Sequence, residues 1–341
     1  NTSFVNRLAD DEAPVDDIVE DPVAVVRRLD TLPHPRIAPP GDIFWPRRNS
    51  AGMPLWDDAT RKPVLAEIEE SLKTQVRATA LVPGDAPGEA LREITSPHDR
   101  SVIVGQVSEA SDAQVDAALR QASDAQEAWD ALGGDYRAKC LEKAADLYET
   151  NAARLFALLI REAGKTLDNA QADLREAVDF LRYYASEARA NFGKPDDLPG
   201  PTGETNQMFL RGRGVFACIA PWNFPLAIFT GQMCAALAAG NSVMAKPAEQ
   251  TPLIAFEAVK LLHLAGVPED VLSLLPGDGA RIGAQLLRHG NLGGVAFTGS
   301  TQTAHIINRS LAARTGPILP LIAETGGMNA MIVDSSALPE Q

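Results

Sequence analysis

Short apolar runs alternate with longer helical patterns through the second half of the chain. Runs of this kind form buried strands, and they lie at residues 215–220, 242–245, 271–275, 293–297, 318–323 and 330–333. Helices are predicted to begin near Leu226, Thr251, Gly279 and Ser300, with Thr251 as the cap of its helix. Strands that alternate with helices predict parallel strands joined by crossover helices. The predicted fold class is therefore α/β, with a doubly wound parallel sheet.

Helical spacing dominates the first half of the chain instead. Two strands are predicted within residues 90–107, around the turn at Ser96-Pro97-His98-Asp99. Helices follow at 111–132, at 135–163 and at 167–191. The stretch 206–214 then predicts a hairpin that leads into the sheet.

The first 84 residues have acidic clusters and scattered prolines, which are typical of a linker. One part of this region, residues 63–79, has Val64, Ile68, Leu72 and Val76 at helical spacing. We interpret the whole region as a linker that includes a docking helix.

Composition narrows the classes of function. The chain has 341 residues, of which 45% are hydrophobic, and a formal net charge of −14. This charge argues against nucleic acid as a partner, and no apolar run is long enough to span a bilayer. The three cysteines, Cys140, Cys218 and Cys234, are too few and too scattered for a disulfide framework or a zinc site. We expect a cytoplasmic protein with reduced thiols and no metal, whose contact with a membrane would require regions outside this chain.

The stretch 214–246 organises the predicted sheet. Its first strand leads into Pro221-Trp222-Asn223-Phe224-Pro225, where two prolines force an irregular turn. An apolar helix follows and ends at Gly240-Asn241, and a second strand ends at Lys246. An amide such as Asn223 before a buried helix suits an oxyanion, and a lysine at the end of a strand suits an anionic or hydroxyl-rich ligand.

Polar residues follow the carboxyl ends of several predicted strands, where open α/β sheets bind their ligands. These residues are Asn223, Lys246, Glu249, Gly279, Ser300 and Glu324. Each also has an ordinary structural interpretation, for example Ser300 as a helix cap or Glu249 as an acid near a helix start. The glycines at 277, 279 and 283 miss the dinucleotide-binding spacing by one residue, whereas Thr298-Gly299-Ser300 suits a pyrophosphate. The shared location of these residues predicts a dinucleotide site.

Four ordered motifs carry a family resemblance. They are Pro221-Trp222-Asn223-Phe224-Pro225, Lys246-Pro247-Ala248-Glu249, Phe297-Thr298-Gly299-Ser300 and Glu324-Thr325-Gly326-Gly327. Residues 90–333 therefore resemble the NAD(P)-dependent aldehyde dehydrogenase superfamily. More narrowly, residues 323–341 and the leader 1–7 resemble the proline utilization A family, in which a flavin-dependent proline dehydrogenase barrel precedes an L-glutamate γ-semialdehyde (1-pyrroline-5-carboxylate) dehydrogenase module.

The resemblance implies a division of the chain. Residues 1–84 would follow an upstream proline dehydrogenase domain, and FAD is expected only in that domain. Residues 85–198 would be the N-terminal helical part of the second module, 199–213 the first half of an oligomerisation hairpin, and 214–341 a Rossmann-like NAD-binding core. The chain would thus start at the end of the barrel region and stop inside the second module. The full-length bacterial protein, a homodimer, would oxidise L-glutamate γ-semialdehyde to L-glutamate in proline catabolism.

The resemblance also implies roles for single residues. Asn223 would donate to the aldehyde oxygen, and Glu324 would activate water for thioester hydrolysis. Lys246 and Glu249 would bind the adenosine ribose, and the acid would disfavour the 2′-phosphate of NADP. The other positions implied to line the cofactor are Ile219, Ala220, Pro221, Trp222, Gly279, Gly283, Phe297, Thr298, Gly299, Ser300, Thr303, Thr325 and Gly326. Glu176 and Phe180 would border the semialdehyde pocket, although Glu176 also reads as a salt-bridging surface residue.

The nucleophile of the family is absent. It is a cysteine in a Gly-Gln-x-Cys segment after the Glu-x-Gly-Gly motif, and no cysteine follows Glu324. That thiolate forms the thiohemiacetal, from which hydride passes to NAD. We interpret the three cysteines present as inert, so we expect this chain alone to be inactive.

Two alternatives remain open from the sequence. One is an acyl-forming or phosphorylating relative such as glutamyl phosphate reductase, against which the water-activating Glu324 argues. The other is a non-catalytic nucleotide-binding fragment or interaction module.

Overall fold

The computed structural model describes residues 12–32, 34, 36–84 and 87–337. The chain forms two compact units, Asn1–Arg48 and Asn49–Gln341. The first contains the short helices α2 (Val15–Ile18) and α3 (Pro22–Arg27) and a 3-10 turn at Pro40–Asp42, none of which has a buried residue. The leader 1–7 and the first acidic cluster up to Asp11 lie outside the described residues, as do residues 338–341.

A five-stranded sheet forms the centre of the second unit. Its strands are β6 (Val215–Ile219), β7 (Ser242–Lys246), β8 (Leu272–Leu274), β9 (Leu292–Gly299) and β10 (Leu321–Thr325). They pair in the order β10-β9-β6-β7-β8, and every pair is parallel. The chain builds outward from β6 to β8 and then returns to the other side of β6, so the strand order reverses between β6 and β9. This confirms the predicted doubly wound parallel sheet.

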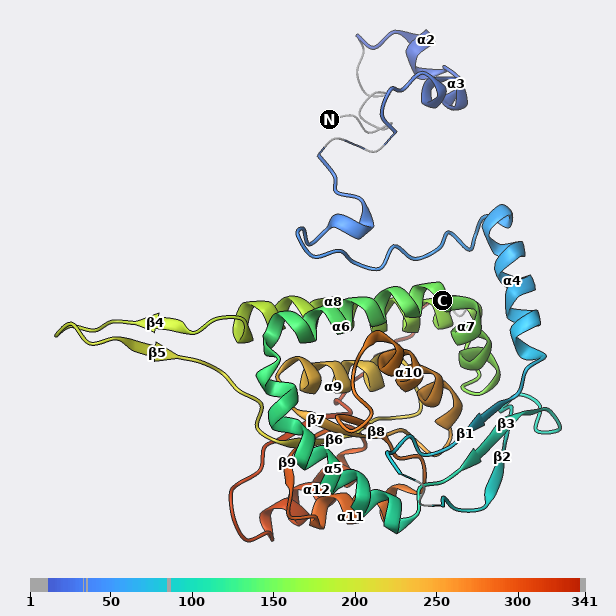
Figure 1. The fold of residues 1–341 in the computed structure, drawn as a ribbon. Coiled ribbons are helices and arrows are strands. Elements are labelled where there is room, and N and C mark those ends of the chain that lie inside the picture. The colour runs from blue at the N-terminus through green and yellow to red at the C-terminus, as the bar shows by residue number, and fades with distance from the viewer. Residues whose placement is uncertain (1–11, 33, 35, 85–86, 338–341) are drawn as a thin grey trace. The chain divides into compact units, whose positions relative to one another are not determined.

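Helices cover both faces of this sheet (Figure 1). Successive residues of β6 point to opposite sides: Phe216 and Cys218 belong to one hydrophobic cluster, and Val215 and Ala217 to another. The first cluster includes residues of α9 (Ala227–Ala238) and α10 (Pro252–Ala265). The second includes residues of α5 (Asp112–Ala131), α11 (Gly279–Arg288) and α12 (Thr301–Ala312). The alternation explains why these strands are apolar along their whole length.

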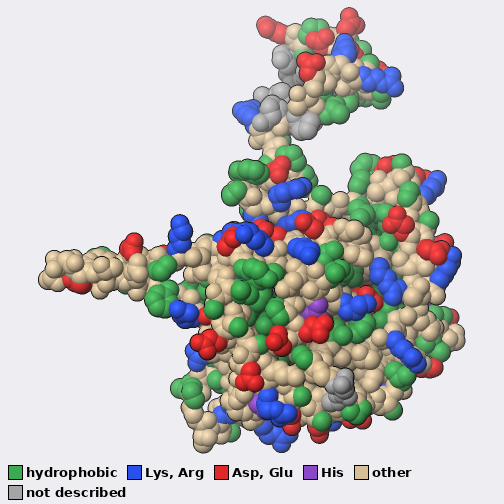
Figure 2. All heavy atoms as spheres, viewed as in Figure 1, with side chains coloured by type: hydrophobic (Ala, Val, Ile, Leu, Met, Phe, Trp, Pro, Cys, Tyr) green, Lys and Arg blue, Asp and Glu red, His purple; other side chains and the backbone are tan. Residues whose placement is uncertain are grey.

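A layer of further helices packs beyond α9 and α10. It consists of α6 (Gly133–Thr150), α7 (Ala152–Arg161) and α8 (Leu167–Phe192), with α6 and α8 side by side (Figure 1). The predicted single helix over 135–163 is wrong, because the chain breaks at Asn151. There the backbone leaves helical geometry, and the Asn151 side chain donates to the Leu147 carbonyl. Acidic and basic side chains are interspersed over this layer (Figure 2), for example Arg182 between Asp146 and Glu149.

A smaller sheet lies at the edge of the second unit. It contains β1 (Val76–Ala78), β2 (Leu91–Thr95) and β3 (Ile103–Ser108), in the order β1-β3-β2. The antiparallel pair β2–β3 confirms the predicted strand-turn-strand. Helix α4 (Asp58–Leu72) ends before Val76, so the prediction of helix to residue 79 is wrong. Val76 instead pairs with Gly105, whose missing side chain permits the approach, since an added Cβ would lie 2.4 Å from the Val76 carbonyl oxygen.

Two further strand predictions differ from the structure. The hairpin predicted over 206–214 is misplaced. The structure instead pairs β4 (Asp196–Leu198) with β5 (Asn206–Met208) in antiparallel fashion, in a hairpin that projects from the body (Figure 1), and residues 209–214 form no strand. The predicted strand at 330–333 does not form. That stretch is exposed, and no neighbouring strand in the described part of the chain pairs with it. Its backbone N–H and C=O groups therefore lack the inter-strand hydrogen bonds that define a strand.

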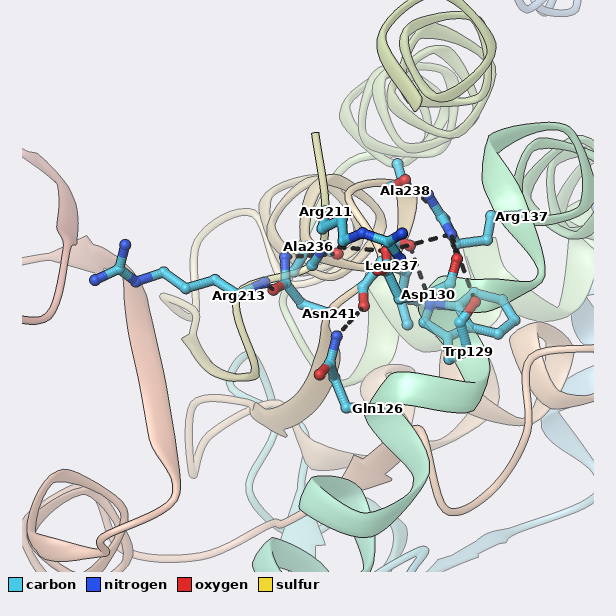
Figure 3. A network of polar contacts seen from close by, with 12 residues as sticks. Gln126, Trp129, Asp130, Arg137, Arg211, Arg213, Ala236, Leu237, Ala238 and Asn241 are labelled. Atoms are coloured by element: carbon cyan, nitrogen blue, oxygen red, sulfur yellow. Dashed lines mark hydrogen bonds and ion pairs between the residues drawn. The ribbon is translucent and has the colours of Figure 1, made fainter. Parts of the chain in front are cut away.

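The end of α9 is held by side chains from α5 and α6 (Figure 3). Trp129 donates to the Leu237 carbonyl at 3.1 Å, and Gln126 to that of Gly240 at 2.8 Å. Arg137, which is only 1% exposed, donates to the Ala238 carbonyl at 3.0 Å. These donors satisfy carbonyls that a helix end leaves without partners. Gly240 has a φ of 85°, which confirms the predicted glycine at this C-terminus.

The same network fixes the root of the hairpin. Asn241 accepts hydrogen bonds from the backbone N–H groups of Arg213 and Gly214, at 2.6 and 3.1 Å. Asp130 accepts one from the N–H of Gly212 at 3.0 Å. These hydrogen bonds therefore fix the backbone directly before β6.

Candidate functional site

A cleft of about 970 Å³ opens at the carboxyl ends of the parallel strands. It lies where the strand order reverses, the position at which open α/β sheets bind ligands. The predicted catalytic and cofactor residues all line it. They are Ile219, Ala220, Pro221, Trp222, Asn223, Lys246, Glu249, Gly279, Gly283, Phe297, Thr298, Gly299, Ser300, Thr303, Glu324, Thr325 and Gly326. The structure thus brings these side chains together, and their individual roles stay predictions.

The turn that carries Asn223 is braced from α8. The residue before α9 makes no side-chain cap, and the carboxylate of Asp173 accepts from the Ala227 N–H at 2.7 Å instead. The Lys165 ammonium lies 3.2 Å from the other Asp173 oxygen and 4.3 Å from the ring centre of Phe224, the neighbour of Asn223. Sequence reasoning missed both braces. One signal was present, because Asp173 is an acid within the apolar stripe of its helix.

Lys246 is buried at the bottom of the cleft, with 2% of its surface exposed. Its ammonium donates to the Pro247 carbonyl at 2.8 Å and lies 3.9 Å from the Glu249 carboxylate. Burial lowers the pKa of Lys246, while Glu249, Asp278 and Glu109 oppose this effect by favouring the cation. Because these contacts fix its position, the Lys246 ammonium is placed to donate a hydrogen bond to a hydroxyl or anionic group in the cleft.

Two glycines leave room in the wall of the cleft. An added Cβ at Gly283 would meet no other atom within 4 Å, and one at Gly279 would touch only the end of Lys246, at 3.7 Å. Gly283 lies within α11, where glycine costs about 1 kcal/mol relative to alanine. Packing within the chain does not require glycine at either position. The space beside them therefore stays open to the cleft.

The start of α12 faces the same cleft. The Ser300 hydroxyl accepts from the Thr303 N–H at 3.1 Å, so Ser300 does cap the helix. The positive end of a helix favours an anion such as a phosphate. Sequence reasoning missed Gln232 of α9, whose amide donates to the Ile219 carbonyl at 3.2 Å and to the Thr298 hydroxyl at 3.0 Å. Gln232 therefore links β6 to β9, the two strands between which the strand order reverses.

Asn223 and Glu324 approach the cleft from different strands. Asn223 follows β6, whereas Glu324 lies on β10 in register with Thr298 of β9. One strand separates β6 from β10, so their backbones are about 10 Å apart at this edge. Both residues line the same cleft.

The two predicted substrate residues do not line the cleft. Phe180 of α8 packs on α9, where an added Cβ at Gly231 would lie 3.0 Å from its ring. It also stacks on Tyr184, with ring centres 6.1 Å apart. Glu176 is exposed, and its pKa is raised by partial burial and then by the nearby Asp173. Their predicted contact with substrate stays a prediction.

The three cysteines are free and buried. Burial raises the pKa of Cys218 to about 12 and also raises the pKa of Cys140 and of Cys234. A raised pKa disfavours the nucleophilic thiolate. Among the described residues, no group of three or more His, Cys, Asp or Glu side chains is arranged to hold a metal ion. In that same part of the chain, none of the helices combines the length and the hydrophobicity that a bilayer-spanning segment needs.

This fold and this cleft define a doubly wound α/β protein with a ligand cleft where the strand order reverses. Within that class, the model of the aldehyde dehydrogenase family matches residues 84–340. The chain belongs to the aldehyde dehydrogenase family.

Known relatives share both sequence and structure with the chain. It is 47% identical to the bifunctional protein PutA of Klebsiella aerogenes, over 100% of this chain and 26% of that protein. It is 35% identical to a 1-pyrroline-5-carboxylate dehydrogenase of Geobacillus thermodenitrificans, over 82% of this chain and 55% of the relative. The chain thus spans about a quarter of the curated bifunctional proteins that it matches.

Solved structures agree with these relatives. A proline utilization A variant from Bradyrhizobium japonicum superposes with a TM-score of 0.79 at 47% identity, over 100% of this chain and 31% of that one. The 1-pyrroline-5-carboxylate dehydrogenase from Thermus with bound NAD gives a TM-score of 0.78 at 30% identity, over 84% of this chain and 56% of that one.

Proposed function

We propose that the chain is the NAD-binding part of an enzyme that oxidises L-glutamate γ-semialdehyde to L-glutamate. The observation that carries this proposal is the single cleft that Asn223, Lys246, Glu249, Ser300 and Glu324 share. The substrate rests on the relatives, which are named PutA and 1-pyrroline-5-carboxylate dehydrogenase.

The residues of the cleft fit NAD. Lys246 and the outward carboxylate of Glu249 would hold the hydroxyls of the adenosine ribose. The start of α12 at Ser300 would face the pyrophosphate, and the space beside Gly279 and Gly283 would admit the adenosine half. When bound, NAD supplies the acceptor for the hydride that leaves the aldehyde carbon. The carboxylate of Glu249 would repel a 2′-phosphate, so NAD is favoured over NADP.

Two residues of this chain would act on the substrate. The Asn223 amide would donate a hydrogen bond to the aldehyde oxygen as negative charge develops on it. The Glu324 carboxylate would accept a proton from the water that releases the acid product. The nucleophile would be a cysteine outside residues 1–341, because the cysteines of this chain are buried with raised pKa values.

The regions outside the cleft take supporting roles in this proposal. Residues 1–84 would dock the module to an upstream proline dehydrogenase domain, to which FAD would belong. Residues 85–198 would brace the site, and 214–341 would bind NAD. Residues 199–213, which include the turn and the second strand of the hairpin, would contact a second copy of the protein in a homodimer.

Calorimetric titration of the chain with NAD and NADP tests the proposal. We expect NAD to bind more tightly than NADP, and Lys246→Ala and Glu249→Ala each to weaken NAD about tenfold. Lys260→Ala is the control, because Lys260 of α10 is half-exposed and lies outside the cleft. Unchanged NAD affinity in the Lys246→Ala/Glu249→Ala double variant would disprove the ribose assignment.

A further inference from the structure

The loop that carries the proposed ribose contacts is followed by a helix without a cap of its own. Helix α10 begins at Pro252, and the expected cap, Thr251, makes no side-chain hydrogen bond to the helix. The Thr251 hydroxyl is buried and has no hydrogen-bond partner in the described part of the chain. The first N–H groups of a helix need acceptors from elsewhere.

Glu162 supplies these acceptors from α7. One of its carboxyl oxygens accepts from the Leu253 N–H at 2.7 Å, and the other accepts from the Ile254 N–H at 2.8 Å. The Glu162 side chain is 4% exposed and lies just after the end of α7. A carboxylate at the positive end of a helix is favourable, so Glu162 ties the start of α10 to the helical layer.

The loop at 247–251 is therefore held at both ends. At its beginning, Lys246 pairs with Ile219 in the sheet. At its end lies the first turn of α10, which Glu162 holds. Between them, Arg92 of β2 donates to the Glu249 carbonyl at 3.0 Å and pairs with Glu109 at 3.2 Å. Arg92 is half-exposed, whereas Glu162 is buried. The hydrogen bonds between Glu162 and the first turn of α10 are therefore better shielded from water than the contact between Arg92 and the loop.

We propose that Glu162 is a positioning residue of the nucleotide site. By fixing the first turn of α10, it holds the preceding loop in the form in which Lys246 and Glu249 receive the adenosine ribose. This inference rests on the proposed function of these two residues. A helix that loses its cap frays at its first turn, and Glu249 lies only three residues before Pro252. The frayed loop must be ordered again when the nucleotide binds, which lowers the affinity.

Two substitutions and a control separate positioning from general stability. Glu162→Gln keeps one carbonyl acceptor, and Glu162→Met keeps none. Asp57→Ala removes the cap of α4, whose Ala59 N–H donates to the Asp57 carboxylate at 3.2 Å, far from the loop at 247–251 in sequence and outside the cleft. Each variant is titrated with NAD and with AMP, which contains the adenosine ribose. The titrations are done at pH 8.5, above the pKa of about 8 to which burial raises Glu162.

We expect graded losses of affinity. Glu162→Met should weaken both NAD and AMP about tenfold, Glu162→Gln about threefold, and Asp57→Ala not measurably. Amide hydrogen exchange of residues 247–254 without nucleotide should be faster in Glu162→Met than in the unsubstituted chain or the control. Far-UV circular dichroism should show the same helix content in all variants.

Failure of this inference and failure of the proposed function would give different results. If the unsubstituted chain binds NAD and AMP and the Glu162 variants bind them equally well, this inference is overturned and the proposed function stands. Unchanged exchange of residues 247–254 in Glu162→Met overturns it as well. If the unsubstituted chain binds neither nucleotide, the proposed function fails and this inference fails with it.

Discussion

Replacing Arg137 with methionine should destabilise the second unit strongly. The Arg137 guanidinium donates to the carbonyls of Asp130 at 2.7 Å, Ala238 at 3.0 Å and Trp129 at 3.4 Å (Figure 3). It is almost fully buried and also lies 5.6 Å from the ring centre of Phe192. Methionine has a similar apolar stem but no donor. The Ala238 carbonyl would therefore lose its donor, whereas the Asp130 and Trp129 carbonyls would keep only the Leu132 N–H.

The size of the effect follows from the hydrogen bonds that are lost. A buried polar group without a partner costs about 1–3 kcal/mol, which applies to the Ala238 carbonyl. Each of the other two hydrogen bonds contributes about 0.5–1.5 kcal/mol, so the total cost is roughly 2–6 kcal/mol. Loss of the contact with Phe192 adds about 0.5–1 kcal/mol. Removing a buried cation relieves part of its desolvation penalty and offsets some of this cost. We expect a net loss of about 3 kcal/mol in the free energy of unfolding.

Urea unfolding followed by circular dichroism measures this loss, with Arg189→Met as the matched control. Arg189 also makes several polar contacts, to Glu142 and Asp135, but it is 37% exposed and its partners are exposed too. Exposed ion pairs contribute about 0–1 kcal/mol, so the control should lose at most about 1 kcal/mol. If Arg137→Met proved no less stable than Arg189→Met, the reasoning from buried carbonyls would be refuted.

Two further predictions concern titration and reactivity. Burial raises the pKa of Glu162 from 4.5 to about 8, against the opposing effects of the two backbone N–H groups and of Arg92, the charged group that faces it. The folded chain then binds more protons than the unfolded chain between these values, so the free energy of unfolding falls as the pH rises from 4.5 to about 8 and levels off above that. The urea midpoint should therefore drop between pH 6 and pH 9, and Glu162→Gln should remove that part of the drop; parallel profiles would contradict the assignment. The thiols of Cys140, Cys218 and Cys234 are buried with raised pKa values. A thiol reagent should therefore modify them only as the chain unfolds in urea. A cysteine that reacts quickly in the native chain would show this prediction to be wrong.

The sequence predicted the sheet and the location of the site for the same physical reason. An apolar run that is buried on both faces is visible in one dimension, and parallel strands deliver whatever follows them to one edge. Asn223, Lys246 and Glu324 could therefore be placed at that edge without knowledge of the strand order. The break at Asn151 could not be predicted in the same way, because the apolar spacing continues on both sides of it.

A local sequence pattern could not predict contacts between residues that are distant in the sequence. Glu162 meets its partner Leu253 across 91 positions, and Asp173 meets Ala227 across 54. A buried acid in an apolar stripe indicates that it has a partner, because burying an unpaired charge is costly. It does not indicate which N–H group that partner is.

The four helices that follow the site strands begin in two different ways. Helices α11 and α12 are capped by the residues directly before them, Asp278 and Ser300. Helices α9 and α10 are capped by Asp173 and Glu162, which belong to the helical layer. A local cap forms with its own turn, whereas a distant cap acts only once its own helix is in place. The conformations of the Asn223 turn and of the loop at 247–251 therefore depend on α7 and α8, so the helical layer shapes the cleft and is more than a separate support.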